Sequence, residues 1–323
     1  MPLDPDAETL HAMIRAAGRP PFETLTPDEA RRAFAAGRAA TQPEPQEVAE
    51  VRDLACPGPH GEIKLRAYRP RGTAPDEVLP ALIYFHGGGW LLGDLESHDG
   101  ACRHYANGAR CRVVSVDYRM APEHKFPAAI DDSAAASKWI IANAGALGIN
   151  HTRVAVGGDS AGGNLAAVLA IMARDGDLPP LAYQLLVYPA TDMAMVTRSS
   201  QTASEGILTT KTMKWFIDHY LRGPKDVTDW RASPLRAADL SGVAPALVLT
   251  CSYDPLRDEG IAYAQRLERE GVRVTHLHYS DEPHGFVGQG KIIRAGNTAL
   301  DMMAAALKKV LWPPPQIELP KGK

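Results

Sequence analysis

Six short apolar runs, all of them after residue 78, constrain the fold of this chain more than any other feature. They span residues 79–86, 111–118, 152–158, 181–189, 244–252 and 272–280. Runs that are apolar at nearly every position are typical of strands buried on both faces of a parallel sheet. Segments with helical spacing of apolar residues lie between most of them, at 128–144, 160–175, 258–271 and 291–311. This alternation predicts an α/β fold in which helices cover both faces of a mostly parallel sheet.

Two segments lie outside the alternation. Residues 1–40 have a helical pattern that includes a capping box at 26–29, and more than fifty residues separate the fourth apolar run from the fifth. That long gap contains a helical stretch at 209–223, so we expect both segments to pack over one end of the sheet as a cap. The alternating residues 61–70 predict a half-exposed antiparallel strand. The predicted division is a cap segment at 1–45, core at 46–189, a cap insertion at 190–225, core at 226–312 and a loose tail at 313–323.

Charge and cysteine content exclude several classes of protein. The 35 basic and 38 acidic residues give a net charge of -3, so no basic excess exists to bind nucleic acid. No run approaches the ~18 apolar residues of a membrane span, and the acidic start is not typical of a secretory signal. The four cysteines form no CxxC pair and predict reduced thiols, hence a cytoplasmic protein. They are Cys56, Cys102, Cys111 and Cys251.

The motif Gly158-Asp159-Ser160-Ala161-Gly162 has the pattern GxSxG and lies between a predicted strand and a predicted helix. A sharp turn at such a junction exposes the serine hydroxyl, and small flanking residues are needed because the backbones crowd there. The start of the helix favours negative charge. A glycine-rich turn with an accidental serine is the alternative, but the context favours Ser160 as a nucleophile.

A second motif, His86-Gly87-Gly88-Gly89-Trp90, directly follows the first apolar run. Successive glycines allow backbone N–H groups to face a cavity without obstruction by side chains. Two of these N–H groups, with that of Ala161, would form an oxyanion hole. A flexible turn is the alternative, which the joint occurrence of the two motifs makes unfavourable.

A serine nucleophile needs a base and an acid that orients it. His284 follows the last apolar run in a loop, whereas His276 and His278 lie inside that run. Active sites of parallel α/β folds lie beyond the carboxyl ends of the strands, so His284 is the preferred base. Asp254 follows the preceding run and lies between serine and base in chain order, as an orienting acid should. The competing acids are Asp258, which we expect to open a helix, and Glu282, which belongs to the loop of the base.

The chain resembles the hormone-sensitive-lipase-like family of serine esterases, because it contains HGGGW, DYRMAPEHKFPAAIDD, GGDSAGGNLA, YP, DPLRDEG and HGF in this order. The resemblance covers about residues 45–310. It implies the α/β-hydrolase fold, carboxylester hydrolysis without metal or other cofactor, and Ser160, Asp254 and His284 as a catalytic triad. It also implies Gly88, Gly89 and Ala161 as oxyanion donors, with His86 and Gly87 as structural support. Lactone or amide hydrolysis on the same triad and a non-catalytic, receptor-like binding protein are the alternatives.

Further residues are expected to shape the site. We expect Asp159 to hydrogen-bond to the glycine loop rather than to react, and we assign Trp90, Trp215 and Phe286 to the substrate pocket, although core packing is the alternative for these rings. The expected partner is a small ester with a short- to medium-chain acyl group, bound in a bounded apolar pocket. The last apolar run should form an edge of the sheet, where a second copy could pair with it, so a homodimer is a candidate assembly.

Overall fold

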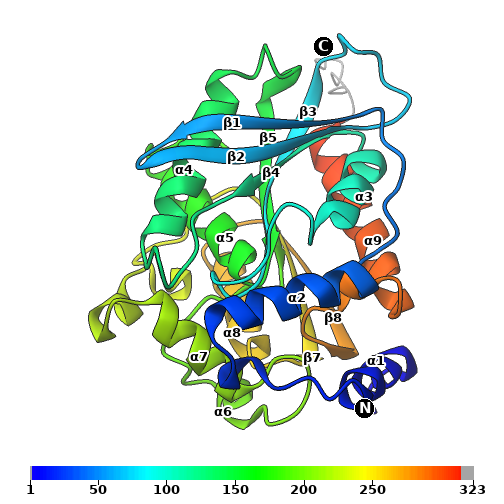
Figure 1. The fold of residues 1–323 in the computed structure, drawn as a ribbon. Coiled ribbons are helices and arrows are strands. Elements are labelled where there is room, and N and C mark those ends of the chain that lie inside the picture. The colour runs from blue at the N-terminus through cyan, green and yellow to red at the C-terminus, as the bar shows by residue number, and fades with distance from the viewer. Residues whose placement is uncertain (1, 314–323) are drawn as a thin grey trace, which may run out of the picture.

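A computed structural model of the chain describes residues 2–313, which contain an eight-stranded sheet (Figure 1). The strand order is β1-β2-β4-β3-β5-β6-β7-β8. The bounds are β1 Glu50–Gly58, β2 Gly61–Arg69, β3 Leu79–Phe85, β4 Arg112–Asp117, β5 Ile149–Asp159, β6 Tyr183–Val187, β7 Ala246–Tyr253 and β8 Val274–Pro283. β2 pairs antiparallel with both β1 and β4, and all other neighbouring strands are parallel.

The six apolar runs form β3 to β8 and residues 61–70 form β2, as the sequence predicts. Strand β1 was not predicted from the sequence. It is an edge strand, most of its residues are exposed or only half-buried, and it contains Pro57. Its residues therefore lack the alternation of apolar and polar side chains that marks a half-buried strand, and pairing with β2 alone positions it.

Helices cover both faces of the sheet, as predicted. The α-helices are α1 Pro5–Ala16, α2 Pro27–Thr41, α3 Asp99–Ala109, α4 Ala128–Ala142, α5 Ala161–Arg174, α6 Arg198–Thr202, α7 Thr210–Tyr220, α8 Arg257–Arg269 and α9 Arg294–Leu311. Short 3₁₀ turns are η1 Phe22–Thr24, η2 Pro224–Thr228, η3 Pro234–Arg236 and η4 Phe286–Gln289. Helix α3, with two glycines in eleven residues, is the one long helix of the core that the sequence pattern did not predict.

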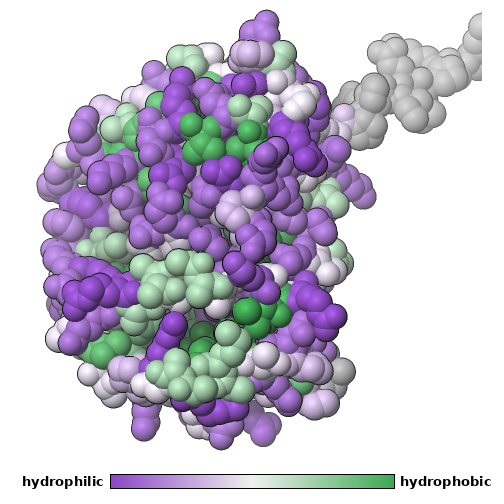
Figure 2. All heavy atoms as spheres, turned by 45° about the vertical axis from the view of Figure 1, so that its right-hand side comes forward, coloured by the Kyte–Doolittle hydropathy of each residue, from purple (hydrophilic) through white to green (hydrophobic). Residues whose placement is uncertain are grey.

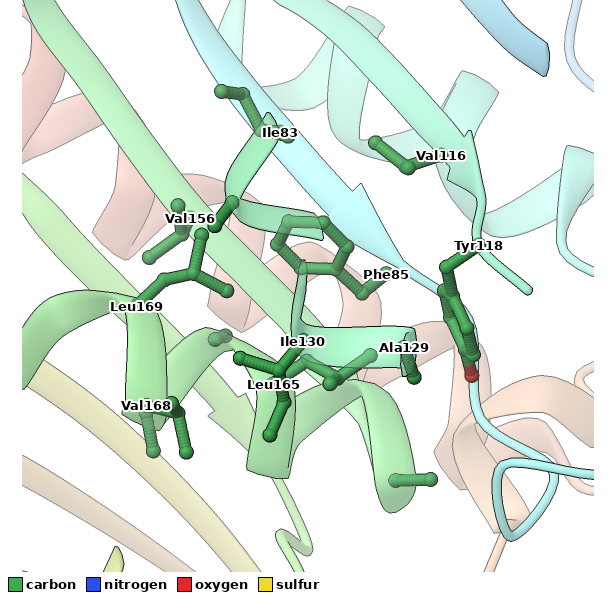
Figure 3. Packing of buried hydrophobic residues seen from close by; sticks show 14 of the residues in the cluster. Ile83, Phe85, Val116, Tyr118, Ala129, Ile130, Val156, Leu165, Val168 and Leu169 are labelled. Carbon is green, nitrogen blue, oxygen red and sulfur yellow. The ribbon is translucent and has the colours of Figure 1, made fainter. Parts of the chain in front are cut away.

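Two hydrophobic clusters, one on each face, hold the layers together. Helices α4, α5 and α8 contribute to the first cluster, and α3 and α9 contribute to the second. Figure 3 shows part of the first, where Leu165 and Leu169 of α5 lie close to Phe85 and Val156 of the sheet. All four side chains are fully buried. Because β5 lies near the middle of the sheet and α5 packs against it, the junction between them is held rigidly.

Helices α1, α2, α6 and α7 gather at one end of the molecule (Figure 1). Helix α2 begins at the predicted capping box, in which Thr26 and Glu29 bond to each other's backbone N–H. Arg31 of α2 donates to both carboxylate oxygens of Glu123, at 2.8 and 2.6 Å, and to the carbonyl of Leu91, at 3.0 Å. The N-terminal segment is thus fastened to the loop that follows the glycine motif.

The predicted C-terminal tail lies outside the described residues except for Pro313. Within residues 2–313 no helix is both long and apolar enough to cross a membrane. The same residues contain no group of three or more His, Cys, Asp or Glu side chains arranged to hold a metal ion. All four cysteines are free and buried.

Candidate active site

Ser160 lies at the junction between β5 and α5, with φ 56° and ψ −115°. This is an unusual conformation for a residue with a side chain, and the surroundings hold it. The Ser160 N–H donates to the carbonyl of Val187 at 2.8 Å. A β-carbon at Gly162 would overlap the carbonyl of Phe85, so the second glycine of GxSxG is needed for close contact between α5 and β3. The sequence thus forms the sharp turn that the motif predicts.

The structure brings the three predicted triad residues together. His284 Nε2 lies 3.0 Å from Ser160 Oγ, and His284 Nδ1 lies 2.8 Å from Asp254 Oδ2. A carboxylate can only accept hydrogen bonds, so Nδ1 carries the proton and Nε2 is free to accept from the serine hydroxyl. Asp254 is further fixed by the N–H of Leu256, which donates to Oδ1 at 2.8 Å. The arrangement suits transfer of the serine proton to His284.

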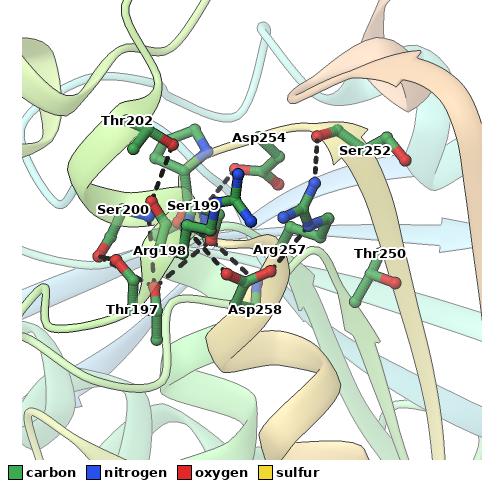
Figure 4. Close-up of polar contacts among 12 residues, drawn as sticks. Thr197, Arg198, Ser199, Ser200, Thr202, Thr250, Ser252, Asp254, Arg257 and Asp258 are labelled. Atoms are coloured by element: carbon green, nitrogen blue, oxygen red, sulfur yellow. Dashed lines mark hydrogen bonds and ion pairs between the residues drawn. The ribbon is translucent and has the colours of Figure 1, made fainter. Parts of the chain in front are cut away.

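The competing acids lie elsewhere. Asp258 accepts hydrogen bonds from Arg257 and from the N–H of Ser199, and Figure 4 shows this cluster beside Asp254. Burial opposes ionisation of Asp258, but these two partners lower the pKa of its carboxyl. Glu282 is buried, and its Oε2 has no hydrogen-bond partner within residues 2–313. Neither carboxyl contacts His284, which leaves Asp254 as its acidic partner.

The remaining histidine candidates form a separate cluster. His276 Nε2 and His278 Nδ1 each lie 2.8 Å from the hydroxyl of Thr250, on neighbouring strands β7 and β8. These side chains project from the face of the sheet, as their position inside the apolar run predicts.

The glycine loop lies directly beside the nucleophile. Gly88 (φ 124°) and Gly89 (φ 62°) line one cavity with Ser160 and His284. The Gly88 carbonyl accepts hydrogen bonds from Leu91 and Leu92 N–H, which closes the turn. Ala161 is the first residue of α5, where N–H groups lack partners within the helix.

His86 and Asp159 support this loop from beneath. His86 stacks on Tyr118 with ring centroids 4.4 Å apart and bonds to the Gly87 carbonyl at 3.0 Å. Burial and the nearby His98 lower the pKa of His86 to about 4, so its ring is neutral. Asp159 accepts from the Gly87 N–H, as expected from the sequence. Burial opposes its ionisation, yet His98, Arg38 and Tyr84 hold the pKa of Asp159 well below its ordinary value.

The cavity beside the triad has a volume of about 70 Å³. Its apolar wall comes from η1, α2, the loops after β3 and β6, and the segment before and within α7. The wall residues are Phe22, Phe34, Leu92, Ala190, Ile207, Leu208, Met213 and Phe216. Arg38, Gln289 and Tyr188, whose ring centroid lies 4.6 Å from that of His284, are further residues of the site that sequence reasoning missed. Arg38 and Gln289 are far from the two motifs in the chain, and no local pattern marks them. Tyr188 belongs to the YP pair of the family resemblance, but no role was assigned to it.

The three aromatic residues assigned to the pocket have different positions. Trp90 lines the cavity and also stacks on Tyr220, with ring centroids 4.2 Å apart. Trp215 does not line it, because Met213 and Phe216, three residues apart on α7, take the inner face of that helix. Phe286 does not line it either. It follows Gly285, which has φ 84°, and packs on Tyr188 in the core.

Comparison with known proteins identifies the family of the chain. A family model described as alpha/beta hydrolase fold matches residues 82–288. The carboxylic ester hydrolase LipN of Mycobacterium tuberculosis is 43% identical over 88% of this chain and 77% of its own length. An ethyl acetate hydrolase of Pseudomonas putida is 38% identical over 96% of this chain and 100% of its own length.

Solved structures are similarly close. An α/β-hydrolase enzyme from the metagenome of Lake Arreo, Spain, superposes with a TM-score of 0.91 at 44% identity, over 95% of this chain and 98% of that one. A hyperthermophilic esterase from the archaeon Pyrobaculum calidifontis gives a TM-score of 0.89 at 42% identity, over 96% of this chain and 99% of that one. The fold and the site define an α/β hydrolase. More particularly, the chain belongs to the hormone-sensitive-lipase-like family of esterases.

Proposed function

We propose that this chain hydrolyses carboxylic esters with short- to medium-chain acyl groups through a covalent acyl-enzyme. The observation that carries the proposal is the continuous hydrogen-bonded series from Asp254 through His284 to Ser160, with contacts of 2.8 and 3.0 Å. Ser160 attacks the ester carbonyl while His284 takes its proton and returns it to the leaving alkoxide. Asp254 holds the histidine tautomer and stabilises the imidazolium. Water activated by His284 then releases the acid.

In this mechanism the N–H groups of Gly88, Gly89 and Ala161 stabilise the oxyanion of the tetrahedral intermediate. Their position around Ser160 and the support of the loop by Asp159 favour that role. The experiment is replacement of Ser160 by Ala, with turnover of an aryl butyrate as the readout. Loss of about five or six orders of magnitude is expected, since the nucleophile belongs to a set of residues that act together. A serine-directed phosphonate should label the unmodified chain at Ser160 alone, and substantial activity in the variant would exclude this nucleophile.

The size of the inner cavity supports the preference for short acyl groups. A volume of about 70 Å³ beside the triad is small compared with typical sites for drug-sized ligands. Segments 1–45 and 190–225 act as a cap over it in this proposal. A series of aryl esters with acyl groups of roughly two to sixteen carbons tests it, with highest kcat/KM expected at about eight carbons or fewer. Faster hydrolysis of long-chain triglyceride emulsions than of a soluble butyrate ester would contradict it.

Two further features of the proposal concern assembly and location. Within the described residues β8 pairs only with β7, so it forms an edge that could pair with the same strand of a second copy about a two-fold axis. A dimeric mass by light scattering is expected, and a monomeric mass would refute it. The four free cysteines favour a reducing compartment, the cytoplasm.

A further inference from the structure

A second, larger hollow adjoins the catalytic cavity. It measures about 1200 Å³ and lies between α1, α2 and residues 201–214. Residues of α2 from Glu29 to Thr41 line it, which corresponds to about 18 Å along that helix. Figure 2 shows a hollow in the lower part of the face that it presents, and hydrophobic atoms lie at the bottom of this hollow. We call it the outer cleft. It shares a boundary with the catalytic cavity, formed by Phe22, Phe34, Arg38, Ile207 and Gln289.

The outer cleft carries four exposed cations. Arg15, Arg19, Lys211 and Lys214 line it, and none of them forms an ion pair within residues 2–313. The Arg19 guanidinium lies against α2, where a β-carbon on Gly37 would come within 2.9 Å of its Nη1. Unpaired cations over an apolar surface favour a ligand that is itself apolar and negatively charged.

The outer cleft has fewer acidic residues than exposed cations, three against four. Two of the acids are Glu23, which accepts a 2.8 Å hydrogen bond from the Thr212 hydroxyl, and Glu29, which is held in the capping box by Thr26. Glu205 is the remaining acid of the lining. The cleft therefore has an excess of positive charge, although the whole chain has a net charge of -3.

Arg38 places a guanidinium at the boundary with the catalytic cavity, where Asp159 balances its charge. The Arg38 side chain is only 7% exposed. Nη1 donates to the carbonyl of Gly288 at 2.6 Å, whereas Nη2 makes no hydrogen bond within the described residues and lies 3.9 Å from Asp159 Oδ2. A buried guanidinium with unused donors beside a cavity is suited to binding an oxygen of a ligand.

The boundary lies on the side where the alcohol leaves. Arg38 bonds to the carbonyl of Gly288. Gly288 and Gln289 both belong to the segment that follows His284. In the proposed mechanism His284 Nε2 gives its proton to the leaving alkoxide, whereas the acyl oxygen lies at Gly88 and Gly89. In the inference that follows, the leaving alcohol is the part of the ester that faces the outer cleft.

We propose that the outer cleft binds the alcohol portion of the substrate, and that this alcohol has an apolar body and an anionic group at its far end. The inference rests on the esterase function proposed above and adds the class of alcohol to it. The preferred substrates are then short-chain acyl esters of hydroxy acids or of similar anionic alcohols. Charge complementarity with Arg15, Arg19, Lys211 and Lys214 is the source of the preference.

Three butyrate esters test this inference. Their alcohols share an unbranched chain of about ten carbons, chosen to fit the outer cleft, and end in a carboxylate, a primary amide or a trimethylammonium group. Butyrate release at concentrations below aggregation gives kcat/KM. We expect the carboxylate ester to exceed the amide ester by about tenfold at low salt and the ammonium ester to be slowest. The preference should shrink in ~1 M salt, where the screening length is ~3 Å.

The double substitution Lys211→Gln with Lys214→Gln should lower the ratio of carboxylate to amide turnover several-fold. Lys308→Gln with Lys309→Gln, an exposed pair at the end of α9, is the matched control and should leave the ratio unchanged. Phosphonate labelling of Ser160 counts folded sites in each variant. Equal turnover of all three esters, or an equal effect of both double substitutions, overturns the inference while leaving the esterase function intact. Hydrolysis of an aryl butyrate but of none of the three esters would also overturn the inference, whereas failure to hydrolyse the aryl butyrate as well would overturn the esterase function itself.

Discussion

Asp159 and Gly87 are joined by a 2.9 Å hydrogen bond from the Gly87 N–H to the Asp159 carboxylate. This contact links the residue before the nucleophile to the start of the glycine loop. The hydroxyl of Tyr84 donates to the same carboxylate oxygen at 2.8 Å. The two catalytic segments, which follow neighbouring parallel strands β5 and β3, are therefore fixed relative to each other by a single buried side chain.

Replacing Asp159 by Asn should weaken this link. An amide oxygen can still accept from Gly87 and Tyr84, but the amide NH₂ would face the cationic Arg38 and the ring of His98. We expect a loss of about 1–3 kcal/mol in the free energy of unfolding, typical of an unsatisfied buried donor. We also expect kcat to fall more than KM rises. Thermal unfolding and butyrate kinetics measure both, and a variant identical to the parent would contradict the role of this contact.

Gly88 should accept no side chain. It has φ 124°, and a β-carbon would overlap the carbonyl of Leu92. Gly88→Ala should therefore displace the loop and lower kcat about 100-fold or more, the scale of losing one oxyanion donor. Gly72→Ala is the matched control, since Gly72 also has a positive φ (72°) but meets no atom within 4 Å. Similar kinetics in the two variants would mean that the loop is only a turn.

Asp254→Asn should lower kcat by several orders of magnitude, because His284 would lose its counter-charge and the control of its tautomer. Asp258→Asn and Glu282→Gln serve as comparisons, since neither carboxyl contacts His284 and both should retain most of the activity. Near-normal activity of Asp254→Asn, together with inactivity of either comparison variant, would assign the acid to another residue.

Glu282 should make stability depend on pH. Burial and the neighbouring Asp4, Asp281 and Asp6 raise the pKa of Glu282 from 4.5 to about 8. The native state therefore holds a proton that the unfolded chain releases, so this contribution to stability is complete below pH 4.5 and is lost as pH rises through about 8. As pH rises from 4.5 to about 8, the Tm of the parent should fall relative to the Tm of Glu282→Gln.

Circular dichroism melts at about pH 5, 7 and 9 measure that difference. Glu62→Gln, at an exposed position on β2, is the control and should follow the parent. Parallel curves for the parent and Glu282→Gln would show that Glu282 is ionised in the folded state at neutral pH.

The sequence predicts those parts of the fold that are determined by residues adjacent in the chain. Apolar runs give β3 to β7, because burial on both faces of a parallel sheet requires apolar side chains at almost every position. The run that forms β8 is less apolar, since β8 is an edge strand whose residues are mostly exposed or half-buried. The turn at Ser160 is predictable because close backbone contacts demand small neighbours. Strand β1 has no such signal, since it is an exposed edge held by pairing with β2.

The same distinction applies to the site. Ser160, Asp254 and His284 each follow a strand, so chain order and the polarity of parallel strands suffice to bring them together. Arg38 comes from a helix at the opposite end of the chain, and its contact with Gly288 depends on how α2 lies across the molecule. Likewise, Phe216 lines the cavity and Trp215 does not, because only one face of α7 turns inward. The sequence does not distinguish these two adjacent aromatic residues.

The first helix of this chain, α1, is held by hydrogen bonds and an ion pair to residues made much later. Asp4 N–H bonds to the carbonyl of Asp281, and the carboxylate of Asp6 pairs with Arg294 at 2.8 Å. During vectorial synthesis the first helix leaves the ribosome hundreds of residues before these anchors exist. Helix α1 therefore docks only after β8 and α9 have emerged, whereas α2 can already bond to Leu91 and Glu123. Completion of the outer cleft, which α1 helps to line, is thus a late step in biogenesis.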